Sequence, residues 1–117
     1  MLWTVDPASD EPLYAQLVTQ ARLAVTRGDL TPGERLPAAR ELATSLDLNV
    51  HTVLRAYQQL RDEGLVDLRR SRGAVVTGTP ADLTAVEEAL ARFVAAARQA
   101  RLSPEATTTL LQEELKR

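Results

Sequence analysis

Apolar residues recur three or four positions apart along the first half of the chain, a spacing that predicts short helices. The three expected helices run from about Pro12 to Arg27, from Ala38 to about Leu46, and from the cap residue Asn49 to the stop residue Gly64. Asp10 or Glu11 is expected to cap the first helix and Gly28 to end it, and Thr31–Gly33 is a turn by its residue chemistry. Only the short breaker at residues 47–49 separates the second helix from the third, so we expect a tight turn there.

Beyond Gly64 the pattern changes from helical to extended. Two short runs rich in β-branched residues, 65–68 and 74–77, flank the segment 69–73. This arrangement predicts a β-hairpin with a basic, glycine-containing tip. Three helices followed by such a hairpin form a winged helix-turn-helix, so the expected fold class is mostly α (α+β), with the hairpin as the wing.

The last part of the chain, after the linker Gly78–Pro80, predicts two more helices. The first has the spacing of a helix-packing seam, and the second begins at Ser103 with Pro104 in its first turn. The apolar residues expected to form a homodimer seam are Leu83, Val86, Leu90, Phe93, Leu110 and Leu111. The alternative is that this stripe folds back on its own domain. We expect a winged helix-turn-helix domain over residues 1–79 and a two-helix C-terminal dimerisation tail over residues 80–117.

Composition at first argues against a nucleic-acid partner. The 117 residues carry a formal net charge of −2, and the sequence pI is about 5.4, whereas DNA-binding domains commonly have a pI above about 9. The charge is unevenly distributed, however, because residues 68–79 hold three arginines and no acid, a local charge of +3. Long basic side chains beside a glycine suit a narrow minor groove, where the potential of DNA is most negative. The wing therefore favours double-stranded DNA as the partner.

In a winged helix-turn-helix the third helix lies in the major groove with its first turn against the base edges. Asparagine pairs with adenine, threonine contacts any base edge, and arginine binds guanine or phosphate. The start of the second helix, flanked by Arg35 and Arg40, offers N–H and guanidinium groups to a phosphate. The predicted DNA-contacting residues are Arg35, Arg40, Asn49, His51, Thr52, Arg55, Arg70, Arg72 and Gly73.

Several of these assignments have a simpler alternative. Asn49 is a helix cap whether or not it touches a base, and His51, the only histidine, is on this view an exposed helix residue without a chemical role. Arg40 is able to pair with Glu34 or Glu41, and a charged hairpin tip is often merely solvated. A winged helix also serves as a protein-interaction module that binds no DNA, and the acidic net charge fits that function.

Other functional classes find little support in the sequence. There is no cysteine, and a single histidine makes neither a metal cage nor a recognisable catalytic group. No glycine-rich phosphate loop is present. No stretch of about 20 apolar residues would span a bilayer, and the N-terminus has no signal-peptide pattern. We expect no enzyme activity, cofactor or metal, and a cytoplasmic location without a membrane partner.

A set of short motifs at fixed spacing resembles the GntR family of bacterial regulators over about residues 11–77. The motifs are PLY at 12–14, GDL at 28–30, LPAARELA at 36–43, TV at 52–53, AY at 56–57 and GLV at 64–66. The short tail, Asn49 at the start of the third helix and the run Arg55–Tyr57 are similar to the YtrA-like subfamily.

This resemblance implies a dimeric transcriptional repressor on a pseudo-palindromic operator, often that of its own operon, which frequently encodes an ABC transporter. It implies dimerisation through the two terminal helices. It places Arg40 on the family's DNA-contacting arginine, Asn49, His51 and Thr52 on the recognition turn, and Arg72 with Gly73 on the wing. Val50 stands where the family usually has arginine or proline, so no operator sequence is transferred. The sequence identifies no small-molecule effector. The short tail leaves little room for a pocket of about 300 Å³, so a ligand would have to lie at the dimer seam.

Overall fold

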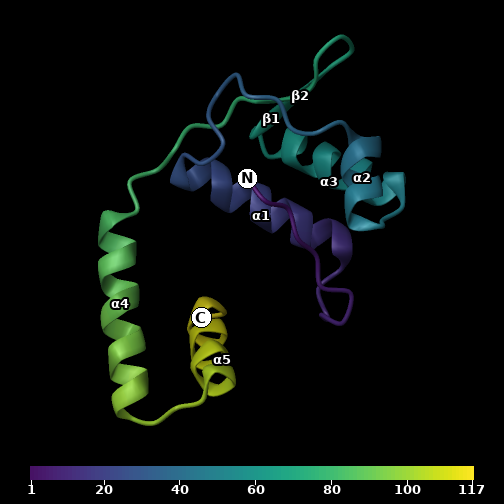
Figure 1. Ribbon diagram of the computed structural model, residues 1–117. Coiled ribbons are helices and arrows are strands. Elements are labelled where there is room, and N and C mark those ends of the chain that lie inside the picture. Colours follow the sequence, from purple (N-terminus) through teal and green to yellow (C-terminus); the bar gives the residue numbers. More distant parts are fainter. The chain divides into compact units, whose positions relative to one another are not determined.

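The computed structural model describes residues 1–117 as five helices and one two-stranded antiparallel sheet (Figure 1). The elements are α1 (Leu13–Arg27), α2 (Ala39–Leu46), α3 (Val50–Asp62), β1 (Val66–Arg69), β2 (Gly73–Val76), α4 (Thr84–Gln99) and α5 (Pro104–Leu115). They form two compact units, which we call the N-terminal unit (residues 1–81) and the C-terminal unit (residues 82–117). The predicted order of three helices, a hairpin and two further helices is confirmed.

The core of the N-terminal unit lies where the apolar stripes of α1, α2 and α3 meet the inner face of the hairpin. Leu17 from α1 and Val53 and Leu60 from α3 have no exposed surface, and Val76 from β2 is 1% exposed. Full burial of one such side chain contributes about 1.5–3 kcal/mol to the free energy of folding. The predicted winged helix-turn-helix therefore rests on a continuous apolar core.

Two of the predicted N-terminal helix caps are confirmed and one is wrong, and Gly28 ends α1 in a left-handed conformation as predicted. The Asn49 side chain accepts a hydrogen bond from the His51 N–H at 2.8 Å, and the Ser103 hydroxyl accepts one from the Ala106 N–H at 3.1 Å. The predicted cap of α1 by Asp10 or Glu11 is wrong: Pro12 occupies the cap position and no side chain accepts a hydrogen bond there. Glu11, which precedes α1, instead accepts a hydrogen bond at its carboxylate from the hydroxyl of Thr19, a residue within α1.

The stretch after the Thr31–Gly33 turn pairs with β2, which sequence periodicity did not predict. The N–H of Gly33 donates to the Val76 carbonyl at 2.8 Å, and the N–H of Val76 donates to the Glu34 carbonyl at 2.8 Å. The N–H of Leu36 donates to the Ala74 carbonyl at 2.9 Å. β2 is therefore hydrogen-bonded on both edges, by β1 and by the segment 33–36 that leads into α2.

The N-terminal segment also joins the core, which was not predicted. Trp3 is only 8% exposed and belongs to the core. Two glutamines one turn apart on α1 hold the backbone of this segment. The Gln20 side-chain amide accepts from the Thr4 N–H at 2.9 Å and donates to the Thr4 carbonyl, and Gln16 makes the same pair of bonds with Asp6 at 2.7 and 3.0 Å.

The C-terminal unit is a pair of helices joined at Arg101, which adopts a left-handed backbone conformation with φ of 60°. Leu83 precedes α4 as its cap residue, and the Asp82 carboxylate accepts from the Thr84 N–H at 3.0 Å. Ala97 is the only buried residue of α4, and α5 has none. None of the five helices combines the length and apolar character that crossing a membrane requires.

Candidate nucleic-acid interface

The turn between α2 and α3 presents α3 as the recognition helix of a helix-turn-helix. Asp47 ends α2 in a left-handed conformation with φ of 55°, and the Leu48 N–H donates to the Ala43 carbonyl at 2.8 Å. The Tyr57 hydroxyl donates to the Pro37 carbonyl at 2.6 Å and so ties the middle of α3 to the residues before α2. Burial raises the pKa of the Tyr57 hydroxyl above its ordinary value, which keeps it a neutral donor.

The two faces of α3 differ sharply. Val53, Ala56, Tyr57 and Leu60 are buried, as the predicted stripe required. On the other side His51 and Arg55 are exposed and Thr52 is half-buried. The exposed side also carries Leu54 and Gln58, which were not named from the sequence although they lie three and seven positions after His51. Gln58 has the chemistry to pair with adenine, and Leu54 has the chemistry to contact a thymine methyl group.

The predicted DNA-contacting arginines are all exposed and make no ion pair, and besides Arg55 on α3 they lie at two places. Arg35 and Arg40 flank the start of α2, and Arg70 and Arg72 lie at the tip of the hairpin. The ion pairs of the chain involve other arginines, namely Arg22, Arg61, Arg69 and Arg117. The alternative in which Arg40 pairs with Glu34 or Glu41 is therefore not formed.

The wing carries less unpaired charge than its sequence indicates. The Nε of Arg69 bonds the Asp67 carboxylate at 3.0 Å, because residues two apart on a strand point to the same face. Two of the three wing arginines, Arg70 and Arg72, stay unpaired. Asp67 lies just before the acid-free stretch 68–79, which is why a count over that stretch alone overlooked it.

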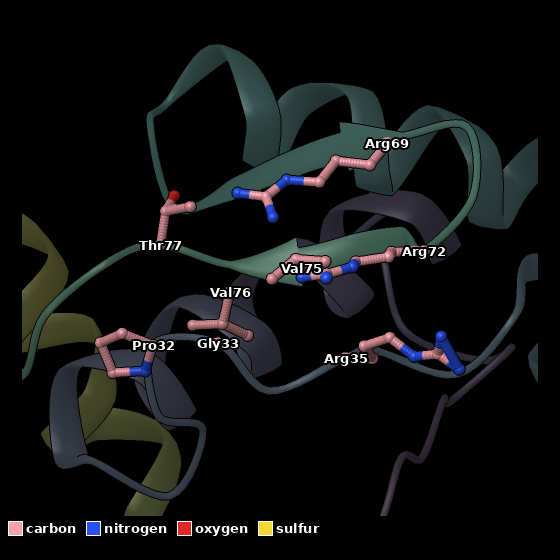
Figure 2. Close-up of a pocket in the computed structure, with 8 residues that line it drawn as sticks. All are labelled: Pro32, Gly33, Arg35, Arg69, Arg72, Val75, Val76 and Thr77. Carbon is pink, nitrogen blue, oxygen red and sulfur yellow. The ribbon is translucent and has the colours of Figure 1, made fainter.

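Arginines also gather on the outer face of the wing, around a hollow of about 470 Å³. Figure 2 shows that the side chains of Arg69 and Arg72 extend from the tip of the hairpin towards its base, whereas Arg35 points the opposite way. Val75 lines this hollow and is 4% exposed, yet it is not part of the main core. The methylene stems of long basic side chains cover apolar surface in this way while their charged ends stay in water.

Two guanidinium contacts join α1 to the α3 region, one at the middle of α3 and one at its C-terminal end. Arg22 on α1 makes a two-pronged bond with Glu63, just after α3, with both N–O distances 2.8 Å. This bond lowers the pKa of the Glu63 carboxyl below its ordinary value. Arg55 on α3 places its guanidinium carbon over the ring of Tyr14 on α1, 3.8 Å from the ring centroid. Sequence periodicity does not predict this contact, and Arg55 was expected only to touch DNA.

The remaining chemistry of the surface is sparse. No group of three or more histidine, cysteine, aspartate or glutamate side chains is placed to hold a metal ion.

Comparison with known proteins agrees with this geometry. A family model described as "Bacterial regulatory proteins, gntR family" matches residues 13–76. The HTH-type transcriptional repressor YtrA of Bacillus subtilis (strain 168) is 38% identical over 73 residues, which are 62% of this chain and 56% of that protein. This chain thus matches little more than half the length of that relative.

Two solved structures share the arrangement. YtrA from Sulfolobus acidocaldarius, described as a GntR-family transcription factor, has a TM-score of 0.60 at 27% identity, covering 97% of this chain and 97% of that chain. The DNA-binding domain of AraR in complex with operator ORX1 has a TM-score of 0.56 at 25% identity, covering 64% of this chain and 93% of that chain.

Proposed function

This chain belongs to the GntR family of bacterial regulatory proteins, whose members are DNA-binding transcriptional regulators and not enzymes, and we propose that it is a sequence-specific repressor that binds operator DNA as a homodimer. The expected partner is a double-stranded, pseudo-palindromic operator in the cytoplasm. The proposed division of labour assigns DNA binding to residues 1–79 and dimerisation to residues 80–117.

The observation that carries the proposal is a set of exposed, unpaired guanidinium groups in an otherwise acidic chain. Arg35 and Arg40 at the start of α2 and Arg70 and Arg72 on the wing have no carboxylate partner. Unpaired arginines at these places suit phosphates and a narrow minor groove. The net charge of −2 limits non-specific attraction to DNA, so affinity depends on where these groups lie.

Base reading is assigned to the first turns of α3. His51 and Thr52 present hydrogen-bonding groups on the side of the helix away from the core, and Arg55 follows on the same side, beyond the first turn. Asn49 caps the helix through its side-chain oxygen, so any base contact must use its amide nitrogen or the second lone pair of that oxygen. Gly73 adopts φ of 70°, which lets the wing turn tightly beside Arg72.

Exposed apolar side chains of the C-terminal unit support the homodimer. Val86 is 61% exposed, Leu90 49%, Leu110 46% and Leu111 42%. Leu83 and Phe93 of the predicted seam are half-buried. Apolar surface of this extent on two short helices is the pattern of a surface that a second copy covers. Two recognition helices related by a two-fold axis would then read half-sites about 34 Å apart.

Fluorescence anisotropy tests DNA binding directly. The protein is titrated onto labelled DNA from upstream of its own gene and onto a scrambled duplex, each at two salt concentrations. Tight, salt-sensitive binding to the natural duplex over the scramble is expected. In the variant Arg70→Ala with Arg72→Ala, binding to both duplexes weakens and its salt dependence flattens. A protein-interaction module would bind no duplex even at low salt, and that outcome would replace the proposal.

Sedimentation velocity tests the homodimer. The wild-type chain is expected to sediment as a dimer at micromolar concentration, and Leu90→Glu with Leu111→Glu is expected to sediment as a folded monomer. A wild-type monomer at that concentration contradicts the homodimer and leaves DNA binding by the N-terminal unit to be judged from the anisotropy. Regulation of an ABC-transporter operon stays a prediction from the family resemblance, and no small-molecule effector is proposed.

A further inference from the structure

The stack of Arg55 on Tyr14 couples the exposed side of α3 to α1. The Arg55 guanidinium carbon lies 3.8 Å from the centroid of the Tyr14 ring. Tyr14 is half-buried in the first turn of α1 and packs against the core, so the ring is a fixed platform. Arg55 is exposed, and its guanidinium makes no ion pair.

Stacking of this kind uses the flat face of the guanidinium and leaves its edge available. The N–H donors of arginine lie in the plane of the group, in a fork that matches the oxygens of a phosphate. A guanidinium held face-on against a ring therefore keeps its whole donor edge for a second partner. No hydrogen bond within the chain takes up that edge in Arg55.

The position of the stack decides which part of DNA Arg55 would meet. The first turn of a recognition helix faces the base edges, and Arg55 lies more than one turn beyond the Asn49 cap. Its side chain leaves α3 towards α1, so the guanidinium lies at the side of the recognition helix. A group at the side of a helix in the major groove faces the sugar-phosphate backbone.

We propose that Tyr14 is a positioning residue for DNA binding, whose ring holds the Arg55 guanidinium ready to contact a backbone phosphate at the edge of the major groove. This inference rests on the DNA binding proposed above. A long arginine side chain loses rotamer freedom when it binds, and a platform that fixes it beforehand removes part of that loss. Tyr14 thereby contributes to affinity without touching DNA, and the contribution is independent of base sequence.

A purely structural role for the stack is the competing explanation. In that case the Tyr14–Arg55 contact would only hold α1 against α3. The chain offers a matched control for this, because the Arg22–Glu63 bond also joins α1 to the α3 region, at the C-terminal end of α3. Glu63→Gln weakens the attachment of the two helices and leaves Arg55 and its ring in place.

The experiment is a double-mutant cycle on full-length protein, read by anisotropy on the scrambled duplex at low salt and on the upstream duplex. The variants are Tyr14→Phe, Tyr14→Leu, Arg55→Met, Tyr14→Leu with Arg55→Met, and Glu63→Gln. Thermal unfolding of each variant confirms that it is folded at the temperature of the titration. The slope of affinity against salt concentration is recorded as well, because it reports the number of phosphate contacts.

Tyr14→Phe, which keeps a ring, and Glu63→Gln are expected to bind both duplexes like the wild type. Tyr14→Leu is expected to bind about three- to tenfold more weakly, the size of a partly exposed cation–π contact. Its salt slope stays close to that of the wild type because the arginine charge remains. Arg55→Met weakens binding further and lowers the salt slope by about one phosphate contact per subunit. The double variant binds no worse than Arg55→Met alone, because Tyr14 acts only through Arg55.

Three results would overturn the inference. Losses that multiply in the double variant would mean that Tyr14 acts independently of Arg55, and a loss in Tyr14→Phe would assign the effect to the hydroxyl. A similar loss in Glu63→Gln would assign it to helix attachment. These results are distinct from failure of the proposed repressor function, which appears as equal affinity of the wild type for both duplexes. Phosphate contacts can be measured on either duplex. Only a wild type that binds no DNA at all would therefore contradict both the proposed repressor function and the role of Tyr14.

Discussion

The two units of the chain treat their apolar side chains in opposite ways. In the N-terminal unit Leu17, Val53 and Leu60 are entirely withdrawn from water. In the C-terminal unit Ala97 is the only buried residue, while Val86 and Leu115 are 61% and 76% exposed. The first unit therefore has a closed apolar interior, whereas the second leaves most of its apolar side chains in contact with water.

Truncation of one leucine in each unit makes the sharpest test of this contrast. Leu60→Ala removes a fully buried side chain and is expected to lower the free energy of unfolding by about 2–5 kcal/mol at every protein concentration. Leu90→Ala, at a residue 49% exposed, is expected to change stability only at concentrations where dimers form. Urea unfolding at several protein concentrations measures both. Equal, concentration-independent losses would erase the distinction between the units.

Gly78 lies in a tightly packed part of the N-terminal unit. A methyl group added there would lie 2.8 Å from the Val25 side chain and 2.9 Å from the Leu65 side chain. Gly78→Ala is therefore expected to lower the free energy of unfolding by about 1–3 kcal/mol through overpacking. Thr79→Ala, at the exposed neighbouring residue, serves as the control. A Gly78→Ala variant as stable as the wild type would show that the junction is loosely packed.

The Tyr57 hydroxyl tests whether the unit is held by polar contacts as well as by its core. Tyr57→Phe leaves the ring in place and removes the hydrogen bond to the Pro37 carbonyl. The expected loss is about 1–2 kcal/mol, because an acceptor near the core is left without its partner. Tyr14→Phe is the matched control, since no hydrogen bond involves the Tyr14 hydroxyl. Chemical unfolding of the two variants should separate them clearly, and identical curves would rule out a stabilising role for the Tyr57 bond.

The Arg22–Glu63 bond is expected to give the smallest effect. Its partners have side-chain exposures of 46% and 30%, so solvent screens the pair and its contribution is about 0.5 kcal/mol. The pKa of Glu63 is lowered in the folded state, so the contribution is present above the unfolded pKa of about 4.3 and is lost as pH falls through the folded value. Wild type and Glu63→Gln should differ in unfolding free energy at about pH 7 and converge as the pH falls below the folded pKa of Glu63. A difference that persists in acid would assign it to another cause.

Local rules predicted much of the fold. Periodic apolar residues gave three core helices, and a short polar residue before a helix identified the caps Asn49 and Ser103. The same rule failed at α1, where Glu11 is drawn to Thr19 instead. The burial of Trp3 was not predicted either, because a single aromatic residue in a segment without periodicity gives no pattern that indicates burial.

At the candidate site, residue types were predictable but their partners were not. The exposed arginines of α2 and the wing follow from composition and helical spacing. The stack of Arg55 on Tyr14 and the bond between Arg22 and Glu63 join residues about forty positions apart, a separation that only the packing of α1 against α3 closes. The Arg69–Asp67 pair could have been predicted from the two-residue period of a strand if Asp67 had been counted with the wing.

The double-sided pairing of β2 has a consequence for building hybrid regulators. Because β2 is hydrogen-bonded both to β1 and to the segment 33–36, the smallest cassette that transplants this wing is discontinuous in sequence. In a chimera that exchanges residues 66–76 alone, the new β2 would have to pair with the original segment 33–36. The register of that pairing is set by Gly33, Glu34 and Leu36. Moving both pieces together would carry the wing, its hollow and the approach to α2 as one graft.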